Sequence, residues 1–471
     1  MLPGSRCIPR RPPASSGRAR AQGFNEQEIA WQIEVIRQNT AAVPQSAAQP
    51  AQRARARRVL RSGMIGTATR EAFLLEANKI AAELSSHAIR RGPGAAWIGV
   101  DWLGESEVSQ LVALGPDLYN GSSGIAVFLA AYAAVSGCRS ARELALAAVA
   151  GFRKSLASRS SARMARSLGV GGGTGLGSLV YALALMARSL DDGTLLADAH
   201  AAAELISDDI IAADRQLDVV GGSAGAVLSL LRLYRDTQSS DVLRRAIRCG
   251  EHLLAQPRVG PQGRRSWKTQ GAAAAQPLNG MSHGAAGFAY ALASLFALTE
   301  RHELLDAAAE CIAFENSSYD AKRHNWPDLR PGPESSWPSQ WCHGAVGIGL
   351  SRIATAKCRG PDPNLLKSDI ARALEGVESA WPNALDTLCC GTLGSIEFFC
   401  EAAGVLGRSE LIEGASRRLM AVVKTAGANG DYRWNVGNRQ FSLSLFRGLA
   451  GTGYTLLRRV EDSLPNILIW E

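Results

Sequence analysis

A Gly-x-x-Gly motif followed by an apolar run occurs seven times in this chain of 471 residues. The first glycines of successive pairs are 47 to 62 residues apart, which is enough chain for two helices and their loops. A glycine just before a helix lets the backbone turn sharply and pack closely, so one pair alone is weak evidence. Seven pairs in series indicate a repeat architecture. The pairs are Gly121/Gly124, Gly172/Gly175, Gly222/Gly225, Gly284/Gly287, Gly344/Gly347, Gly391/Gly394 and Gly448/Gly451.

Each repeat contains the signals of two different helices. The segment after each glycine pair is almost wholly apolar, as in Ile125–Val135 and Phe288–Leu298, and a helix that is apolar all round is buried. The segment before each pair is amphipathic, which predicts a half-exposed helix. The amphipathic segments are Thr67–Ile89, Arg139–Ser158, Leu195–Ala212, Asp241–Gln256, Leu304–Tyr319, Leu365–Ser379 and Glu410–Thr425.

This pattern predicts an all-α fold, an α/α toroid in which seven inner helices pack inside seven outer helices. An open solenoid is the alternative, but it needs polar terminal repeats, and the last repeat, Phe446–Leu457, is as apolar as the others. A common register also brings seven helix N-termini to one end of the inner ring. Their partial positive charge favours thiolates and anions there.

The N-terminal segment differs from the rest of the chain. The formal net charge is +8, but residues 1–70 carry 12 Lys and Arg against 3 acidic residues. We expect residues 1–62 to be a basic, largely disordered segment, with Glu26–Arg37 as a short helix, and residues 63–471 to form one domain. A transit peptide and a basic tail that touches nucleic acid are further interpretations of this composition. No secretory signal and no membrane span are present, which predicts a cytoplasmic protein.

The residues just before the glycine pairs distinguish the repeats. Repeat four has His283, repeat five has Cys342 and His343, and repeat six has Cys389 and Cys390. Consecutive repeats are neighbours in a ring, so these side chains should converge at the end where the inner helices begin. Repeats one, two and seven have Asn120, Gly171 and Arg447 at the equivalent place.

Thiolates gathered with imidazole predict a zinc site by ligand type. The candidate ligands are Cys342, Cys389, Cys390, His343 and His283; the alternative is that they are buried cysteines and ordinary loop histidines. Glycosidases and terpenoid cyclases also use α/α toroids, but they need paired carboxylates or Asp-rich motifs. The acidic doublets, Asp191-Asp192 and Asp208-Asp209, both lie away from the glycine pairs.

Several of these segments resemble the cyclase domain of lanthipeptide synthetases. They are Leu118-Tyr119-Asn120-Gly121, Asp218-Val219-Val220-Gly221-Gly222, His283-Gly284-Ala285-Ala286-Gly287, Trp341-Cys342-His343-Gly344 and Cys389-Cys390-Gly391-Thr392-Leu393-Gly394. The resemblance covers about residues 63–471 and is closest to the C-terminal half of the bifunctional class II enzymes. It implies a zinc-dependent cyclase that adds cysteine thiols to dehydroalanine or dehydrobutyrine.

The resemblance also assigns roles to residues. It implies that Cys342, Cys389 and Cys390 hold zinc, with Cys390 where histidine is usual, as in a subgroup with three cysteine ligands. It implies that His343 is not a ligand, that His283 is the catalytic histidine and that Asp218 is the active-site aspartate. A helix cap is the alternative role for Asp218.

The chain departs from the family pattern in two respects. Single-function cyclases have an arginine shortly before the first zinc cysteine, whereas this chain has Pro338 and Ser339. The dehydratase half of a class II synthetase does not resemble any part of the chain, although Phe24–Arg37 is a candidate remnant of it.

The expected partners are therefore a dehydrated precursor peptide and a separate dehydratase, without nucleic acid. The alternatives are a fragment of a bifunctional synthetase and a non-catalytic zinc protein that binds thiols or peptides.

Overall fold

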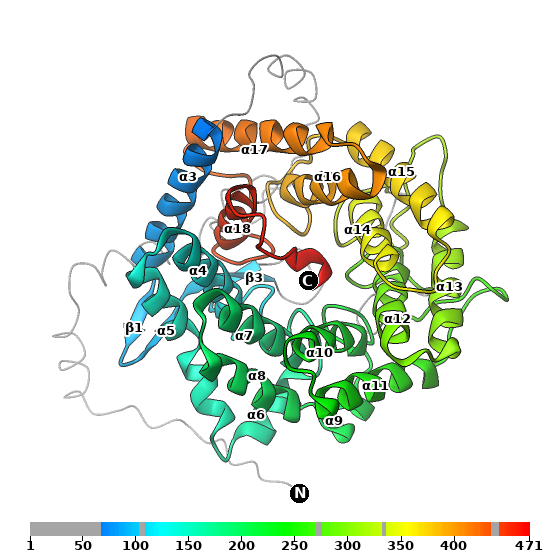
Figure 1. Ribbon diagram of the computed structural model, residues 1–471, viewed down its shortest axis with the longest axis horizontal. Helices are drawn as coiled ribbons and strands as arrows, with labels where there is room; N and C mark the ends of the chain where they lie inside the picture. Colours follow the sequence, from blue (N-terminus) through cyan, green and yellow to red (C-terminus); the bar gives the residue numbers. More distant parts are fainter. Residues whose placement is uncertain (1–66, 103–108, 270–275, 332–335, 435–441) are drawn as a thin grey trace, which may run out of the picture.

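The computed structural model describes residues 67–102, 109–269, 276–331, 336–434 and 442–471. These residues form two concentric rings of helices (Figure 1). The inner ring consists of α4 (Ser122–Ser136), α7 (Leu176–Leu190), α10 (Ser223–Thr237), α12 (Ala285–Thr299), α14 (Ala345–Ala356), α16 (Thr392–Leu406) and α18 (Leu449–Val460). The outer ring consists of α3 (Thr67–Ser86), α5 (Arg139–Leu156), α8 (Gly193–Glu204), α11 (Ser240–Ala255), α13 (His302–Asn316), α15 (Pro363–Ser379) and α17 (Glu410–Asn429).

The first and last helices of the repeat array close both rings. Each of the first six inner helices packs against the outer helix that follows it in sequence, whereas α18 packs against α3. Helix α18 also contacts α4, so the inner ring has no free end. This closure confirms the predicted α/α toroid and excludes an open solenoid.

Some elements differ from the sequence prediction. The predicted helix Leu195–Ala212 is two helices, α8 and the short α9 (Asp208–Ala213), because Ser207 and two acidic residues start a new helix. Two antiparallel hairpins were not predicted, β1 (Ile89–Arg91) with β2 (Gly94–Ala96) and β3 (Ile98–Trp102) with β4 (Ser109–Ala113). Within the described residues, the remaining elements are α6 (Ser161–Leu168) and the 3-10 turn η2 (Ile467–Ile469).

The second glycine of the motif is required by close packing in six repeats. A Cβ atom there would lie 1.8 to 2.4 Å from the carbonyl oxygen of the residue six positions earlier, which no side chain tolerates. The loop before each inner helix therefore folds back directly onto the first turn of that helix. The glycines are Gly124, Gly225, Gly287, Gly347, Gly394 and Gly451.

The predicted register of repeat two is wrong by three residues. Gly175 precedes α7 as the capping residue, so Ser178 occupies the place of the second glycine and Thr174, not Gly171, corresponds to His283. The glycine-rich run of residues 171–177 matches the motif in more than one alignment, which local sequence alone cannot resolve. Gly172 instead packs against repeat three, where its Cβ would lie 2.7 Å from the Gly225 Cα.

The segment predicted to be basic and disordered, residues 1–62, lies outside the described residues, as does the predicted helix Glu26–Arg37. Both stay predictions. Among the described helices, none has both the length and the apolar character needed to cross a bilayer.

We expect Gly225→Ala and Gly151→Ala to change stability in opposite directions. A Cβ at Gly225 would lie 1.8 Å from the Val219 carbonyl oxygen, so alanine should lower the free energy of unfolding by about 1–3 kcal/mol or more. Gly151 lies in an exposed part of α5 with no atom near its Cβ position, so alanine should raise it by about 0.5–1 kcal/mol. Urea unfolding measures both. Wild-type stability in Gly225→Ala would contradict the packing argument.

Candidate metal centre

The loops that precede the inner helices are joined to one another around the ring. Each inner helix starts after one of these loops. We call the end of the inner ring at which the loops lie the mouth of the ring. Backbone hydrogen bonds connect the loops at six of the seven junctions, and the Ser282 hydroxyl donates to the Cys342 carbonyl at the seventh. The bonds run from Tyr119 N–H to Gly173 O, Gly173 N–H to Val220 O, Val219 N–H to Ser282 O, Trp341 N–H to Cys389 O, Cys389 N–H to Phe446 O and Phe446 N–H to Tyr119 O.

This belt of hydrogen bonds brings three cysteines together. Cys342 and Cys389 lie two residues before their capping glycines, and Cys390 lies one residue before its own. The Cys390 sulfur is 3.4 Å from that of Cys342 and 3.3 Å from that of Cys389, and all three sulfurs lie within 4.8 Å of one another. Within the described part of the chain, this is the cluster that has the geometry to hold a metal ion.

The thiols strongly perturb one another. Hydrogen bonds with Cys389 and Cys390, together with burial, raise the pKa of Cys342 well above its ordinary value. Burial raises the pKa of Cys389 to about 12. Hydrogen bonds from the other two thiols hold the pKa of Cys390 well below its ordinary value. The cluster therefore concentrates negative charge on one sulfur, and only a cation would allow all three thiols to ionise together.

The donor set fits zinc. Four ligands at the usual Zn–S distance of about 2.3 Å define a tetrahedron whose sulfurs are about 3.8 Å apart. The observed contacts of 3.3 and 3.4 Å and the upper limit of 4.8 Å lie on either side of that value. Soft thiolates select zinc over magnesium or calcium, and three protein ligands leave one tetrahedral position for another group.

Two residues that contact or face the cluster were not assigned a role from the sequence. The Tyr119 hydroxyl donates to the Cys389 sulfur at 2.8 Å. The Arg447 guanidinium is buried near Tyr119, Cys389 and Cys390; burial lowers its pKa, but the electrostatic influence of these three ionisable groups raises it well above its ordinary value. Tyr119 and Arg447 occupy, in repeats one and seven, the places equivalent to Cys342 and His343. The repeat register had already placed Arg447 at the mouth, and comparing the preceding position of repeat one with Cys342 was the signal that would have found Tyr119.

His283 and Asp218 form a hydrogen-bonded pair at the same mouth. The His283 Nδ1 is 2.8 Å from the Asp218 Oδ2, and the carboxylate is 1% exposed while the imidazole is 38% exposed. The other Asp218 oxygen accepts from the Gly221 N–H at 2.7 Å. The capping role considered for Asp218 belongs instead to Asp214, whose carboxylate accepts both the N–H and the hydroxyl of Ser223 at the start of α10.

His343 lies next to Cys342 but outside the metal cluster. Its ring centroid is 6.3 Å from that of His283. Burial and the nearby Arg330 lower the pKa of His343 to about 4, so the ring is neutral at physiological pH. The structure thus brings His283 and His343 to the mouth without giving either the geometry of a ligand.

A buried ion network ties the His283 loop to the helix that follows Cys342. Glu315 accepts the Gly280 N–H at 2.8 Å, three residues before His283. The same carboxylate pairs with Arg352 of α14 at 2.8 Å, and Arg352 also pairs with Asp369 at 3.0 Å, all three side chains being fully buried. Since a buried charge without its partner is costly, this network holds the His283 loop against α13, α14 and α15.

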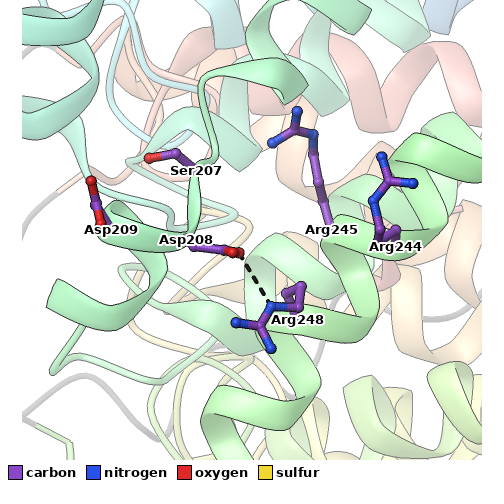
Figure 2. A pocket seen from close by; sticks show the side chains of 6 residues that line it. All are labelled: Ser207, Asp208, Asp209, Arg244, Arg245 and Arg248. Atoms are coloured by element: carbon purple, nitrogen blue, oxygen red, sulfur yellow. Dashed lines mark hydrogen bonds and ion pairs between the residues drawn. The ribbon is translucent and has the colours of Figure 1, made fainter.

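The acidic doublets lie at the ends of helices. Figure 2 shows the pocket of about 530 Å³ between α9 and α11 that contains Asp208 and Asp209. Its arginines are already engaged, since Arg248 pairs with Asp208 and Arg245 donates to the Ile206 carbonyl. Asp191 ends α7 and Asp192 caps α8, away from the mouth. Neither doublet provides paired carboxylates at the mouth, as a glycosidase would need.

The fold and this site define a class of protein, the α/α toroids with three clustered cysteines, able to hold a metal ion, at the mouth of the inner ring. The sequence model of the lanthionine synthetase C-like proteins matches residues 112–469. The chain belongs to this lanthionine synthetase C-like family.

Two known proteins illustrate the relationship. The lacticin 481/lactococcin biosynthesis protein LcnDR2 of Lactococcus lactis subsp. lactis is 26% identical over 195 residues, which are 38% of this chain and 20% of that protein. The match therefore covers far less than two thirds of that relative. A nisin cyclase structure superposes with a TM-score of 0.55 at 16% identity, covering 82% of this chain and 94% of that chain. This second similarity shows the shared fold.

We expect the purified chain to hold one zinc ion, and Cys342→Ala and Cys389→Ala to lose it, because two thiols do not retain zinc against dialysis. Cys311→Ala, which removes a buried thiol outside the cluster, should keep the metal. Binding should weaken as the pH falls, since protons compete for the thiols. Elemental analysis after dialysis measures the zinc content of all three variants. Full zinc content in both cluster variants would refute the assignment.

Proposed function

We propose that this chain is a zinc-dependent lanthionine cyclase that closes thioether rings in a dehydrated precursor peptide. The observation that carries the proposal is the convergence of three thiols at the mouth of the toroid, which also holds the His283–Asp218 pair. Membership of the lanthionine synthetase C-like family supports the same activity. The reaction joins a cysteine sulfur of the peptide to the β-carbon of dehydroalanine or dehydrobutyrine.

Cys342, Cys389 and Cys390 are the proposed zinc ligands. When bound, zinc supplies a Lewis acid that lowers the pKa of a peptide thiol in the fourth position. Three thiolates from the chain more than offset the charge of the ion and keep the peptide sulfur electron-rich. Tyr119 and Arg447 limit this excess of negative charge, because one donates a hydrogen bond to Cys389 and the other places a guanidinium nearby.

His283 is the proposed acid and base. The peptide thiol gives up its proton, its sulfur forms a bond to the β-carbon, and the electron pair of the C=C bond moves to the α-carbon and its carbonyl as an enolate. The α-carbon then takes one proton, so the proton released and the proton consumed balance. Because Asp218 faces Nδ1, it favours the tautomer in which Nε2 carries the lone pair that shuttles this proton.

A non-catalytic zinc protein that binds thiols or peptides is the second candidate. The cysteine cluster alone fits either function, since a thiol can bind zinc without reacting further. The His283–Asp218 pair favours catalysis, because a carboxylate that orients a partly exposed imidazole is an arrangement for proton transfer. Residues 63–471 are proposed as the cyclase domain, and residues 1–62 as a separate basic segment of the chain.

The proposed substrate determines which reaction must precede cyclisation. Dehydroalanine and dehydrobutyrine arise from serine and threonine by loss of water, so a dehydratase must act on the peptide first. We propose this activity as the partner reaction, whether it resides in a separate protein or in a synthetase of which the chain is part.

We expect His283→Ala to keep its zinc and its fold while cyclisation slows by about 10²–10⁴-fold, the usual contribution of a general acid or base. Asp218→Asn should slow the same step, since an amide does not hold the imidazole tautomer in the same way. His302→Ala, which changes an exposed histidine at the start of α13, is the control and should leave the rate unchanged. An unchanged rate in His283→Ala would remove that residue from the mechanism.

The direct test uses a synthetic peptide that carries one dehydroalanine and one cysteine. We expect the zinc-loaded chain to consume the free thiol without a change in peptide mass, faster than buffer with zinc alone. The same peptide with serine in place of dehydroalanine should keep its thiol. Alkylation followed by mass spectrometry measures both. Binding of the peptide without any loss of thiol would favour the non-catalytic alternative.

A further inference from the structure

The chain segment Leu464–Glu471, called the axial segment below, lies at the centre of the inner ring. Figure 1 shows it inside the circle of inner helices, next to the label that marks the end of the chain. It contains the 3-10 turn η2, and the side chains of Asn466 through Trp470 are at most 1% exposed. A polar backbone in such a place must find hydrogen-bond partners.

The inner helices supply those partners. Hydroxyls from α7, α10, α12 and α18 and charged groups from α16 and α18 each bond the axial segment. One of these bonds orients the Trp470 indole, whose N–H donates to the Ser229 hydroxyl at 3.2 Å. The other bonds join Tyr181 to Glu471 O, Tyr290 to Ile469 O, Tyr454 to Pro465 O, Arg458 to Leu464 O and Glu401 to the Asn466 amide.

The axial segment reaches the cysteine cluster through Trp341. The Trp341 indole N–H donates to the Leu468 carbonyl at 3.0 Å, and its ring stacks on Trp470 with centroids 6.3 Å apart. Trp341 directly precedes Cys342, and its backbone N–H donates to the Cys389 carbonyl at 2.9 Å. One fully buried residue therefore connects the axial segment, through its side chain, to both cysteine loops, through its backbone.

An aromatic group continues this connection around the cluster. The Trp341 ring also packs on Phe446 at 5.1 Å, and Phe446 stacks on Tyr119 at 4.6 Å. Tyr119 is the residue whose hydroxyl donates to the Cys389 sulfur. The rings from Trp470 to Tyr119 thus form one packed series that ends at a candidate zinc ligand.

We propose that the axial segment positions the zinc site: the Leu468 carbonyl and Trp470 fix Trp341, and Trp341 fixes the separation of Cys342 from Cys389. The inference rests on the proposed zinc site. Metal ligands depend on the groups that orient them, and loss of such a group lowers metal affinity even when every ligand is kept. Trp341 and Trp470 are positioning residues, since neither offers an atom to the metal.

The test measures metal affinity by chelator competition and the absorption of the cobalt-substituted chain, which reports thiolate geometry. Trp341→Phe keeps a smaller buried ring and loses the N–H that meets Leu468 together with part of the surface that packs on Trp470, and Trp470→Ala removes that second ring. We expect both to bind zinc about 10–100-fold more weakly than the wild type, with an altered cobalt spectrum.

Trp267→Ala is the matched control. Trp267 is also fully buried, packs on Phe288 of α12 and donates its N–H to the Gln256 carbonyl, so its loss removes a comparable side chain from another part of the toroid. It should lower thermal stability while keeping the wild-type zinc affinity and cobalt spectrum.

Wild-type zinc affinity in Trp341→Phe overturns the inference. A loss of zinc affinity in Trp267→Ala equal to that in the two test variants also overturns it, because it would indicate general destabilisation. If Trp470→Ala does not fold, Trp341→Phe decides the question alone. A wild-type chain that binds no zinc would instead refute the proposed function on which the inference rests.

Discussion

The hydrogen bonds that join successive loops at the mouth of the inner ring are the constraint on which the site depends. Each loop is confined between the starts of two inner helices, so its backbone groups need partners within the protein. The neighbouring loop supplies them, and this sets the relative register of consecutive repeats. Cys342 and Cys389 consequently occupy equivalent places in adjacent loops, joined through the Cys389 carbonyl. The motif glycines allow the loops to approach the helices closely enough for these bonds to form.

The close approach of the three cysteine thiols also disfavours their simultaneous ionisation. Three thiols within 4.8 Å of one another, in a buried setting, cannot all be ionised without positive charge close by. The chain supplies part of that charge through Arg447 and a hydrogen bond through Tyr119. A divalent, thiophilic cation could supply the remainder. The cluster is therefore an arrangement that could hold a metal ion.

Carboxylates in the toroid differ in the groups that they face. Asp214 accepts the donors at the start of α10, and Glu315 joins the His283 loop to Arg352 within the buried interior. Asp218 differs from both because one of its oxygens faces a partly exposed imidazole at the mouth. A buried carboxylate with a backbone partner on one side and a histidine on the other is held rigidly, which is what an orienting group requires.

The sequence by itself determined the helical class, the sevenfold repeat and the grouping of Cys342, Cys389 and Cys390 in one layer. These follow from local signals, since glycine spacing and apolar runs report helix starts and buried faces. It did not resolve the register of residues 171–177, where several glycines fit one motif. Only the tertiary structure decided which distant segments meet: the packing of α18 against α3, the contact of Tyr119 with Cys389, and the placement of the axial segment beneath Trp341. The physical reason is ring closure, which joins residues hundreds of positions apart through packing that no local pattern encodes.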